Sequence, residues 1–268
     1  DMVCAKPEGP HAGELVDGPR TRQRSRLQRR EGGDAMKPGL LAVDEAKSAD
    51  ITEQFRAHVA HADFPCVGAK SAQARNMLDV VIAHDMRSGW DDLRIHDRLL
   101  EWADRYRNDP EGLRSMAVIF QQPDEIDEPT FERLLWQRLQ SFAEKDNWLG
   151  QSYDTSVSAD PTDPHFSLSF GGEAYFVVGL NPSASRPARR FAYPTMVFNL
   201  HDQFETLRED GRYERMRDAI LERDRDLAGD INPMLARHGE SSEARQYSGR
   251  AVDEGWECPF RDPRLEEK

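Results

Sequence analysis

Cysteine is scarce in this chain of 268 residues, which contains only Cys4, Cys66 and Cys258. The number is odd and none of the three belongs to a CxxC pair, so neither a disulfide framework nor a structural zinc site is indicated. Such sparse use of cysteine fits a reducing compartment, and we expect the protein to be cytoplasmic.

Long apolar runs and an excess of positive charge are also missing. No stretch approaches the roughly 20 apolar residues that a membrane-spanning helix requires. The net charge of −13 would repel both nucleic acid and anionic membranes, so we expect neither as a partner. This charge permits a cationic substrate, although solubility alone also explains it.

Several catalytic signatures are absent as well. The chain has no glycine-rich phosphate loop, no GxSxG elbow and no HExxH motif. Nucleotide hydrolases, α/β-hydrolases and zinc proteases are therefore disfavoured.

The N-terminal part of the chain differs in composition from the rest. Residues 1–35 have almost no periodic apolar residues, so burial cannot offset the entropy cost of ordering them. Their clustered arginines are Arg20, Arg22, Arg24, Arg26, Arg29 and Arg30. We predict a disordered segment over 1–45 and a single domain over 46–268. Ordinary protein composition begins at Met36, where we expect translation to start, as N-terminal sequencing of the native protein would test.

The spacing of apolar residues predicts an α+β domain in which helices flank a central sheet. Periods of three and four residues predict helices over 49–61, 89–108, 127–147 and 201–226. Short apolar stretches bounded by turn residues predict strands over 115–121, 165–170, 174–180 and 193–200. The first helix has Asp50 as its expected cap, and 73–86 fits either a helix or a strand. The buried stripe expected in the second helix is Leu93, His96, Leu99, Leu100, Ala103 and Tyr106.

A single histidine stands where the last strand gives way to the last helix, in VFNLHDQFETLRED (197–210). With Asn199 as N-cap and Asp202 at the third helical position, His201 would lie in the first turn. The helix dipole disfavours an imidazolium there, which leaves the neutral ring nitrogen that iron ligation needs. A histidine hydrogen-bonded in a cap or a core is the alternative interpretation.

Cys66, in FPCVGAK, is a second candidate ligand, because a thiolate also binds iron. A free cysteine beside Phe64 and Val67 is alternatively an inert, buried apolar residue. Cys258, in WECPF, has the same two interpretations.

Two charged segments add further candidates. Arg186, Arg189 and Arg190, in NPSASRPARR, suit carboxylate or phosphate groups, unless they form a solvated basic loop. Glu240 and Glu243, in GESSEARQYSGR, suit a cationic substrate. Alternatively, the serines between them begin a short helix with both glutamates on its surface.

Together these segments resemble the YqcI/YcgG family. The resemblance rests on FPCVGAKSA, on GGEAYFVVGLNPSASRPARRFAYPTMVFNLHDQFETLREDGRYERM, and on RDRDLAGDINPML, SEARQYSGR and WECPF. It covers most of residues 50–260 and is densest from 170 to 260. Members with known chemistry are haem-dependent oxygenases that N-hydroxylate a guanidino group in natural-product biosynthesis.

The resemblance implies a haem b cofactor, O2, an external electron donor and a cationic amino-acid substrate. That substrate would be free L-arginine or an arginine-derived amino acid. Two other functions stay open: a haem-binding sensor or carrier without turnover, and a haem-free protein of the same fold that binds another small molecule.

The resemblance also implies roles for the candidate residues. The family often has a histidine where this chain has Asn181, so His201 is the expected proximal iron ligand, with Cys66 as its rival. Glu240 or Glu243 would hold the guanidinium over the opposite face of the haem. The arginines expected to anchor the propionates are Arg186, Arg189 and Arg190.

Overall fold

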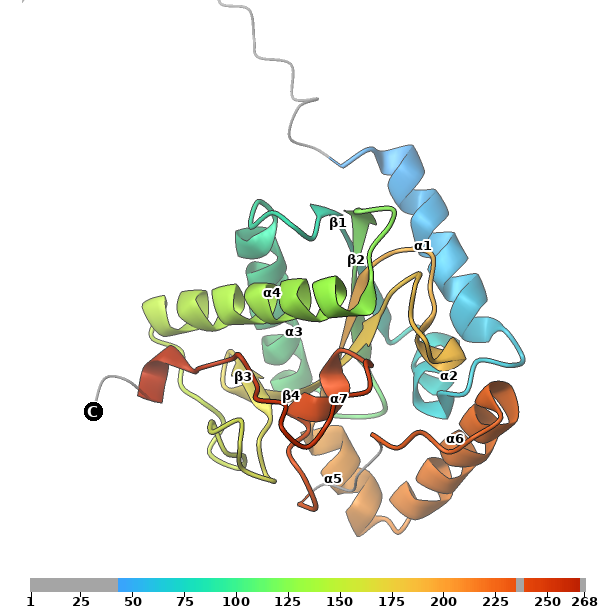
Figure 1. The fold of residues 1–268 in the computed structure, drawn as a ribbon. Helices are drawn as coiled ribbons and strands as arrows, with labels where there is room; N and C mark the ends of the chain where they lie inside the picture. The colour runs from blue at the N-terminus through green and yellow to red at the C-terminus, as the bar shows by residue number, and fades with distance from the viewer. Residues whose placement is uncertain (1–42, 235–238, 266–268) are drawn as a thin grey trace, which may run out of the picture. The chain divides into compact units, whose positions relative to one another are not determined.

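A five-stranded sheet forms the centre of the structure, with strand order β1-β2-β5-β4-β3 (Figure 1). The computed structural model describes residues 43–234 and 239–265. The strands are β1 (Leu78–Asp85), β2 (Ser115–Gln122), β3 (Leu168–Phe170), β4 (Glu173–Leu180) and β5 (Thr195–Leu200). β1 and β2 pair in parallel across a helical connection, whereas β2–β5, β5–β4 and β4–β3 pair antiparallel.

Helices cover both faces of this sheet. The helices of the described residues are α1 (Glu45–Ala60), α2 (Val67–Ala74), α3 (Asp92–Asn108), α4 (Glu128–Trp148), α5 (Asp202–Glu209), α6 (Tyr213–Ala228) and α7 (Ala244–Tyr247), with 3-10 turns η2 (Pro187–Arg189) and η3 (Pro263–Leu265). α3 and α4 pack on one face and α1 and α2 on the other, which gives three layers (Figure 1). None of these helices is both long and apolar enough to cross a membrane.

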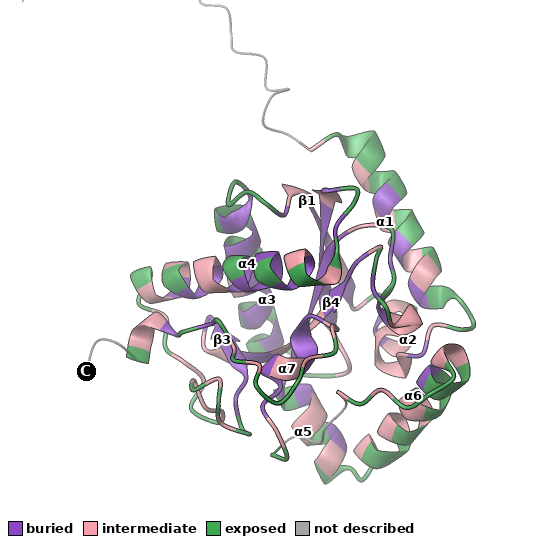
Figure 2. Cartoon of the chain, in the orientation of Figure 1, coloured by how far each residue is buried: buried purple, intermediate pink, exposed green. Residues whose placement is uncertain are grey.

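Alternation along the strands divides the buried side chains between two cores. In β2, Met116 and Val118 belong to the core under α3 and α4, whereas Ala117 and Ile119 belong to the core under α1 and α2. Because both faces are covered, the central residues of this strand, 116–120, are all apolar, and Figure 2 shows the strands as largely buried. Each strand can therefore contribute to a core on one face and to a site on the other.

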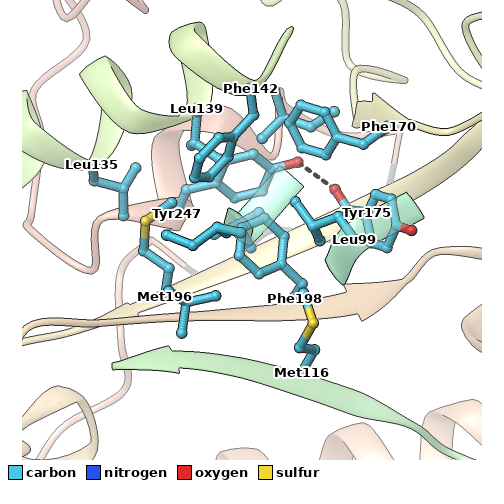
Figure 3. Packing of buried hydrophobic residues seen from close by; sticks show 14 of the residues in the cluster. Leu99, Met116, Leu135, Leu139, Phe142, Phe170, Tyr175, Met196, Phe198 and Tyr247 are labelled. Carbon is cyan, nitrogen blue, oxygen red and sulfur yellow. Dashed lines mark hydrogen bonds between the residues drawn. The ribbon is translucent and has the colours of Figure 1, made fainter. Parts of the chain in front are cut away.

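Aromatic rings fill the larger core and attach the C-terminal segment to the sheet. Tyr247 of α7 is fully buried, and its hydroxyl donates to the Tyr175 carbonyl at 3.2 Å (Figure 3). The centroid of its ring lies 5.3 Å from that of Phe176 and 5.8 Å from that of Trp136. These contacts hold α7 against β4 and α4.

A buried carboxylate joins the ends of several elements. Asp146 of α4 lies 2.9 Å from Nε2 of His96 in α3 and accepts a hydrogen bond from Arg264 of η3 at 2.8 Å. It also accepts the Gly171 backbone N–H at 3.0 Å, in the turn between β3 and β4. Its charge is thus compensated on several sides, as a fully buried charge requires.

The predicted α+β fold with a helix-flanked sheet is confirmed. The four predicted strands are present, and the ambiguous stretch 73–86 divides into the end of α2 and the strand β1. The predicted tail, 1–45, lies outside the described residues except for 43–45, and α1 begins at Glu45.

Two helix-end predictions were wrong. α1 is capped by Asp44 rather than Asp50, because the Asp44 carboxylate accepts the Ala46 N–H at 2.9 Å. The helix predicted over 201–226 is divided into α5 and α6. The interruption falls at Gly211, whose φ of +65° cannot belong to a right-handed helix.

The predicted stripe of α3 was wrong in part. Leu93 is 60% exposed, and Ile95 and Trp102 are buried instead, together with the expected residues His96, Leu99, Ala103 and Tyr106. The face that packs is therefore rotated relative to the one predicted. His96 belongs to both the predicted and the observed face, and its Nε2 lies 2.9 Å from Asp146 in α4.

Gly179 lets α4 and α7 approach β4 closely, and we expect Gly179→Ala to destabilise the fold. A Cβ there would lie 2.7 Å from Cε1 of Phe131 and 2.9 Å from the backbone oxygen of Tyr247, which cannot rotate away. Overpacking of this kind should lower the free energy of unfolding, measured in urea, by about 1–3 kcal/mol. Gly255→Ala is the control, because the nearest atom to its Cβ would be 3.5 Å away, on Asp253. Equal effects of the two changes would contradict this account.

Candidate functional site

An apolar cavity lies on the side of the sheet that α1 and α2 cover. Its empty space, open mouth included, is about 1690 Å³. Alternate residues of β4, namely Phe176, Val178 and Leu180, line it together with Val197 of β5. The strands thus place apolar side chains in this wall while their intervening residues fill the larger core.

His201 lines this cavity from the end of β5 and is 5% exposed. The sequence predicted that His201 would lie in the first turn of the helix. It is instead the residue before α5, and its side chain makes no capping hydrogen bond. The predicted cap, Asn199, stays in β5, where its side-chain oxygen accepts the Ser115 hydroxyl at 2.7 Å. The helix therefore begins later than its sequence pattern indicates.

Glu243 meets His201 inside the cavity from the segment that precedes α7. It is 7% exposed, and its Oε2 accepts the Ser167 hydroxyl at 2.7 Å. Nε2 of His201 lies 3.9 Å from Oε1 of Glu243 and 3.9 Å from Oε1 of Glu205, and these contacts are ion pairs when the ring is protonated. Glu240 is exposed and lies outside the residues that line the cavity.

The distance between His201 and Glu243 restricts the roles they can share. At 3.9 Å, the two side chains leave no room for a planar group between them. They therefore face the same side of any flat ligand. This differs from the arrangement expected from the resemblance, in which they took opposite faces of a haem.

Cys66 lines the same cavity from the N-terminus of α2. Its Sγ accepts the Ala69 backbone N–H at 3.4 Å and so caps the helix. Burial raises the pKa of the thiol, against the opposing effect of backbone hydrogen bonds and of nearby Arg189. Cys258 packs instead against the larger core, where burial raises its pKa to about 12.

Arg186, one of the three predicted arginines, ties the loop after β4 to α6. Its Nε donates to Asp224 at 2.9 Å and its Nη1 donates to Asp230 at 2.9 Å. Burial alone would lower the pKa of Arg186, but these hydrogen bonds hold that pKa above its usual value. Both Arg186 and Asp224 line the cavity.

Arg189 lies in the cavity wall and is only 9% exposed. Its guanidinium donates to the carbonyls of Gly179 and Gln246 at 3.2 Å and of Tyr247 at 3.5 Å, so it caps the C-terminus of α7. Burial lowers its pKa to about 10. Within 43–234 and 239–265, no carboxylate forms an ion pair with it.

Arg190 and Asn181 serve the turn rather than the cavity. Arg190 donates to the carbonyls of Ala184 at 2.6 Å and Ser185 at 2.8 Å, and it does not line the cavity. The side-chain oxygen of Asn181 accepts the Ser183 N–H at 3.0 Å. The structure thus brings Arg186 and Arg189, but not Arg190, to the site.

Two charged residues of α6, Arg217 and Asp224, line the cavity and were not predicted from the sequence. A signal was present, since they occur at helical spacing with Tyr213, Ile220 and Leu221. What the spacing could not show is that this face of the helix lies over a cavity. Among the described residues, no cluster of three or more His, Cys, Asp or Glu side chains could hold a metal ion.

The site thus belongs to an α+β protein with an apolar cavity, and the cavity wall carries a histidine, a thiol and charged groups of both signs. The chain is a member of the YqcI/YcgG family, whose sequence model matches residues 55–261. That match includes every cavity residue named above. No curated protein and no solved structure matches the chain.

We expect Arg186→Gln to destabilise the protein strongly, because Asp224 is 4% exposed and would lose its cation. Leaving a buried charge uncompensated should lower the free energy of unfolding in urea by about 3–5 kcal/mol. Asp230→Asn is the matched control, because its side chain is 73% exposed. Such a surface pair contributes less than about 1 kcal/mol. A loss no larger for Arg186→Gln than for Asp230→Asn would contradict the importance given to the buried pair.

Proposed function

We propose that this protein is a haem-dependent oxygenase of the cytoplasm that N-hydroxylates the guanidino group of free L-arginine or of an arginine-derived amino acid, as a step in natural-product biosynthesis. One observation carries the proposal. A single apolar cavity brings together two side chains that can ligate haem iron, Cys66 and His201, and a buried carboxylate, Glu243, that can bind a guanidinium.

The residues present fit a haem. The apolar wall formed by Phe176, Val178 and Leu180 suits a porphyrin. Within the part of the chain that the structure describes, Arg189 hydrogen-bonds to neutral carbonyls and has no ion pair, and we assign it to a propionate. When bound, the haem would supply the activation of O2, with electrons from an external donor.

Cys66 would hold the haem iron, because the 3.9 Å contact between His201 and Glu243 puts these two side chains on the same side of any flat ligand. With the iron on Cys66, neither His201 nor Glu243 is needed as an iron ligand, and Glu243 can serve the substrate. The Ala69 N–H at the N-terminus of α2 favours a thiolate by its hydrogen bond to Sγ, although burial raises the pKa of the free thiol, and bonding to iron would supply the remaining stabilisation. If His201 held the iron through Nδ1 instead, Glu243 beside Nε2 would become the carboxylate partner of the ring rather than of the substrate.

Glu243 is the group that we assign to the substrate guanidinium. A carboxylate can accept two parallel hydrogen bonds from a guanidinium, which fixes the orientation of the reacting nitrogen. The Ser167 hydroxyl holds one oxygen of the carboxylate at 2.7 Å and so fixes its plane. In the overall reaction, one oxygen atom of O2 enters an N–H bond and the other leaves as water, with two electrons and two protons consumed.

The first test is the haem itself. Protein purified from haem-supplemented cells should show a Soret band and about one haem per chain. Cys66→Ser should abolish the thiolate signature of the ferrous–CO spectrum or lose the haem, while the hydroxyl still caps α2. His201→Ala should keep that signature, as should His61→Ala, an exposed control.

Two results would contradict this assignment. Loss of haem from His201→Ala but not from Cys66→Ser would place the iron on His201. A wild-type protein that stays colourless after haem supplementation would refute haem chemistry and favour a haem-free binding protein.

The second test is turnover. With L-arginine and a reductant, the holoprotein should consume O2 and form a hydroxyguanidine detectable by mass spectrometry. Glu243→Gln should lower kcat/KM by about 10- to 100-fold, because it removes a charged hydrogen-bond acceptor from the guanidinium. Glu240→Gln is the matched control and should behave as wild type, since Glu240 lies outside the cavity. Tight haem binding without any product would indicate a sensor or carrier.

A further inference from the structure

The helix α6 turns one face to the cavity. The residues of α6 that line the cavity are Tyr213, Met216, Arg217, Ile220, Leu221 and Asp224. Their spacing of three and four positions defines a single stripe, whereas most of the remaining residues of the helix are exposed (Figure 2). Two of the six are charged, in a stripe that is otherwise apolar or aromatic.

The two charged residues differ in how their charges are compensated. Asp224 is paired with Arg186, which donates to it at 2.9 Å. Arg217 is half-buried and has no ion-pair partner within 43–234 and 239–265. Arg208 also lines the cavity and is the lining arginine nearest to Arg217 in the sequence. Its charge is compensated, because it pairs with Glu205. Arg217 therefore adds a positive charge to the cavity wall that no described carboxylate balances.

An arginine in this position is costly unless an anion joins it. A charged side chain that loses part of its hydration needs a hydrogen-bond acceptor in place of the water. The neighbours of Arg217 on the stripe, Ile220 and Leu221, offer no hydrogen-bond acceptor. A ligand carboxylate would satisfy the guanidinium in a planar, bidentate manner.

We propose that Arg217 binds a carboxylate of the ligand in this cavity, and that the carboxylate is the α-carboxylate of the amino-acid substrate. This inference rests on the proposed function. Glu243 and Arg217 then recognise the two oppositely charged ends of one amino acid, each from a different element of the fold. Arg217 is thereby a specificity residue that excludes guanidines without a carboxylate.

The test compares L-arginine with agmatine, which has the same guanidino group but no carboxylate. Dissociation constants are measured by calorimetry on the haem-loaded protein, for wild type, Arg217→Gln and Arg223→Gln. Arg223 is exposed on the same helix, and glutamine has nearly the helix propensity of arginine, so Arg223→Gln controls for charge and for helix stability. Arg217→Gln should weaken the binding of L-arginine by about 10- to 100-fold and leave agmatine binding within about 2-fold.

The carboxylate that Arg217 binds could belong to the substrate or to a haem propionate. Haem content, read from the Soret band, distinguishes these two sources. Unchanged haem content with the selective loss of L-arginine supports the α-carboxylate. Loss of haem from Arg217→Gln, with unchanged affinity for L-arginine in the fraction that remains loaded, would assign Arg217 to a propionate and overturn the substrate role. Wild-type behaviour of Arg217→Gln in both measurements would overturn the inference and leave the proposed function standing. A wild-type holoprotein with affinity neither for L-arginine nor for an arginine-derived amino acid would overturn both.

Discussion

The buried guanidinium of Arg189 holds the site together. It joins the carbonyl of Gly179 at the end of β4 to the last carbonyls of α7, which would otherwise have no helical partner. α7 has only four residues and could not persist without such tertiary contacts. Because Glu243 immediately precedes this helix, its place beside His201 depends on the same arginine.

Much of the fold was predictable from the sequence, because apolar spacing reports which faces are buried. The strands containing Val118, Val177 and Phe198 follow from short apolar stretches with turns on either side. The exact ends of helices were less predictable. Asp44 and Asp50 are both plausible caps, and only the path of the chain decides that Asp44 accepts the Ala46 N–H.

The candidate site was predictable in its residue types but not in its pairings. The sequence singled out His201, Cys66 and Glu243 by the chemistry of their side chains, and all three line one cavity. It could not show that Glu243 lies beside His201 while Glu240 lies at the surface, because the two glutamates occur in the same polar segment. Distances across the fold carry that information, and they decide which roles are compatible.

The cavity also has a consequence for the water around α6. Met216, Ile220 and Leu221 line an open space and remain only half-buried, so the apolar side of this helix keeps part of its hydration shell. A ligand that displaces this water would remove it from α6 and lose part of its own hydration in the same step. Ligand binding should then decrease the heat capacity by more than burial of the ligand's own apolar surface explains. The additional decrease arises because the apolar side of α6 is buried as well.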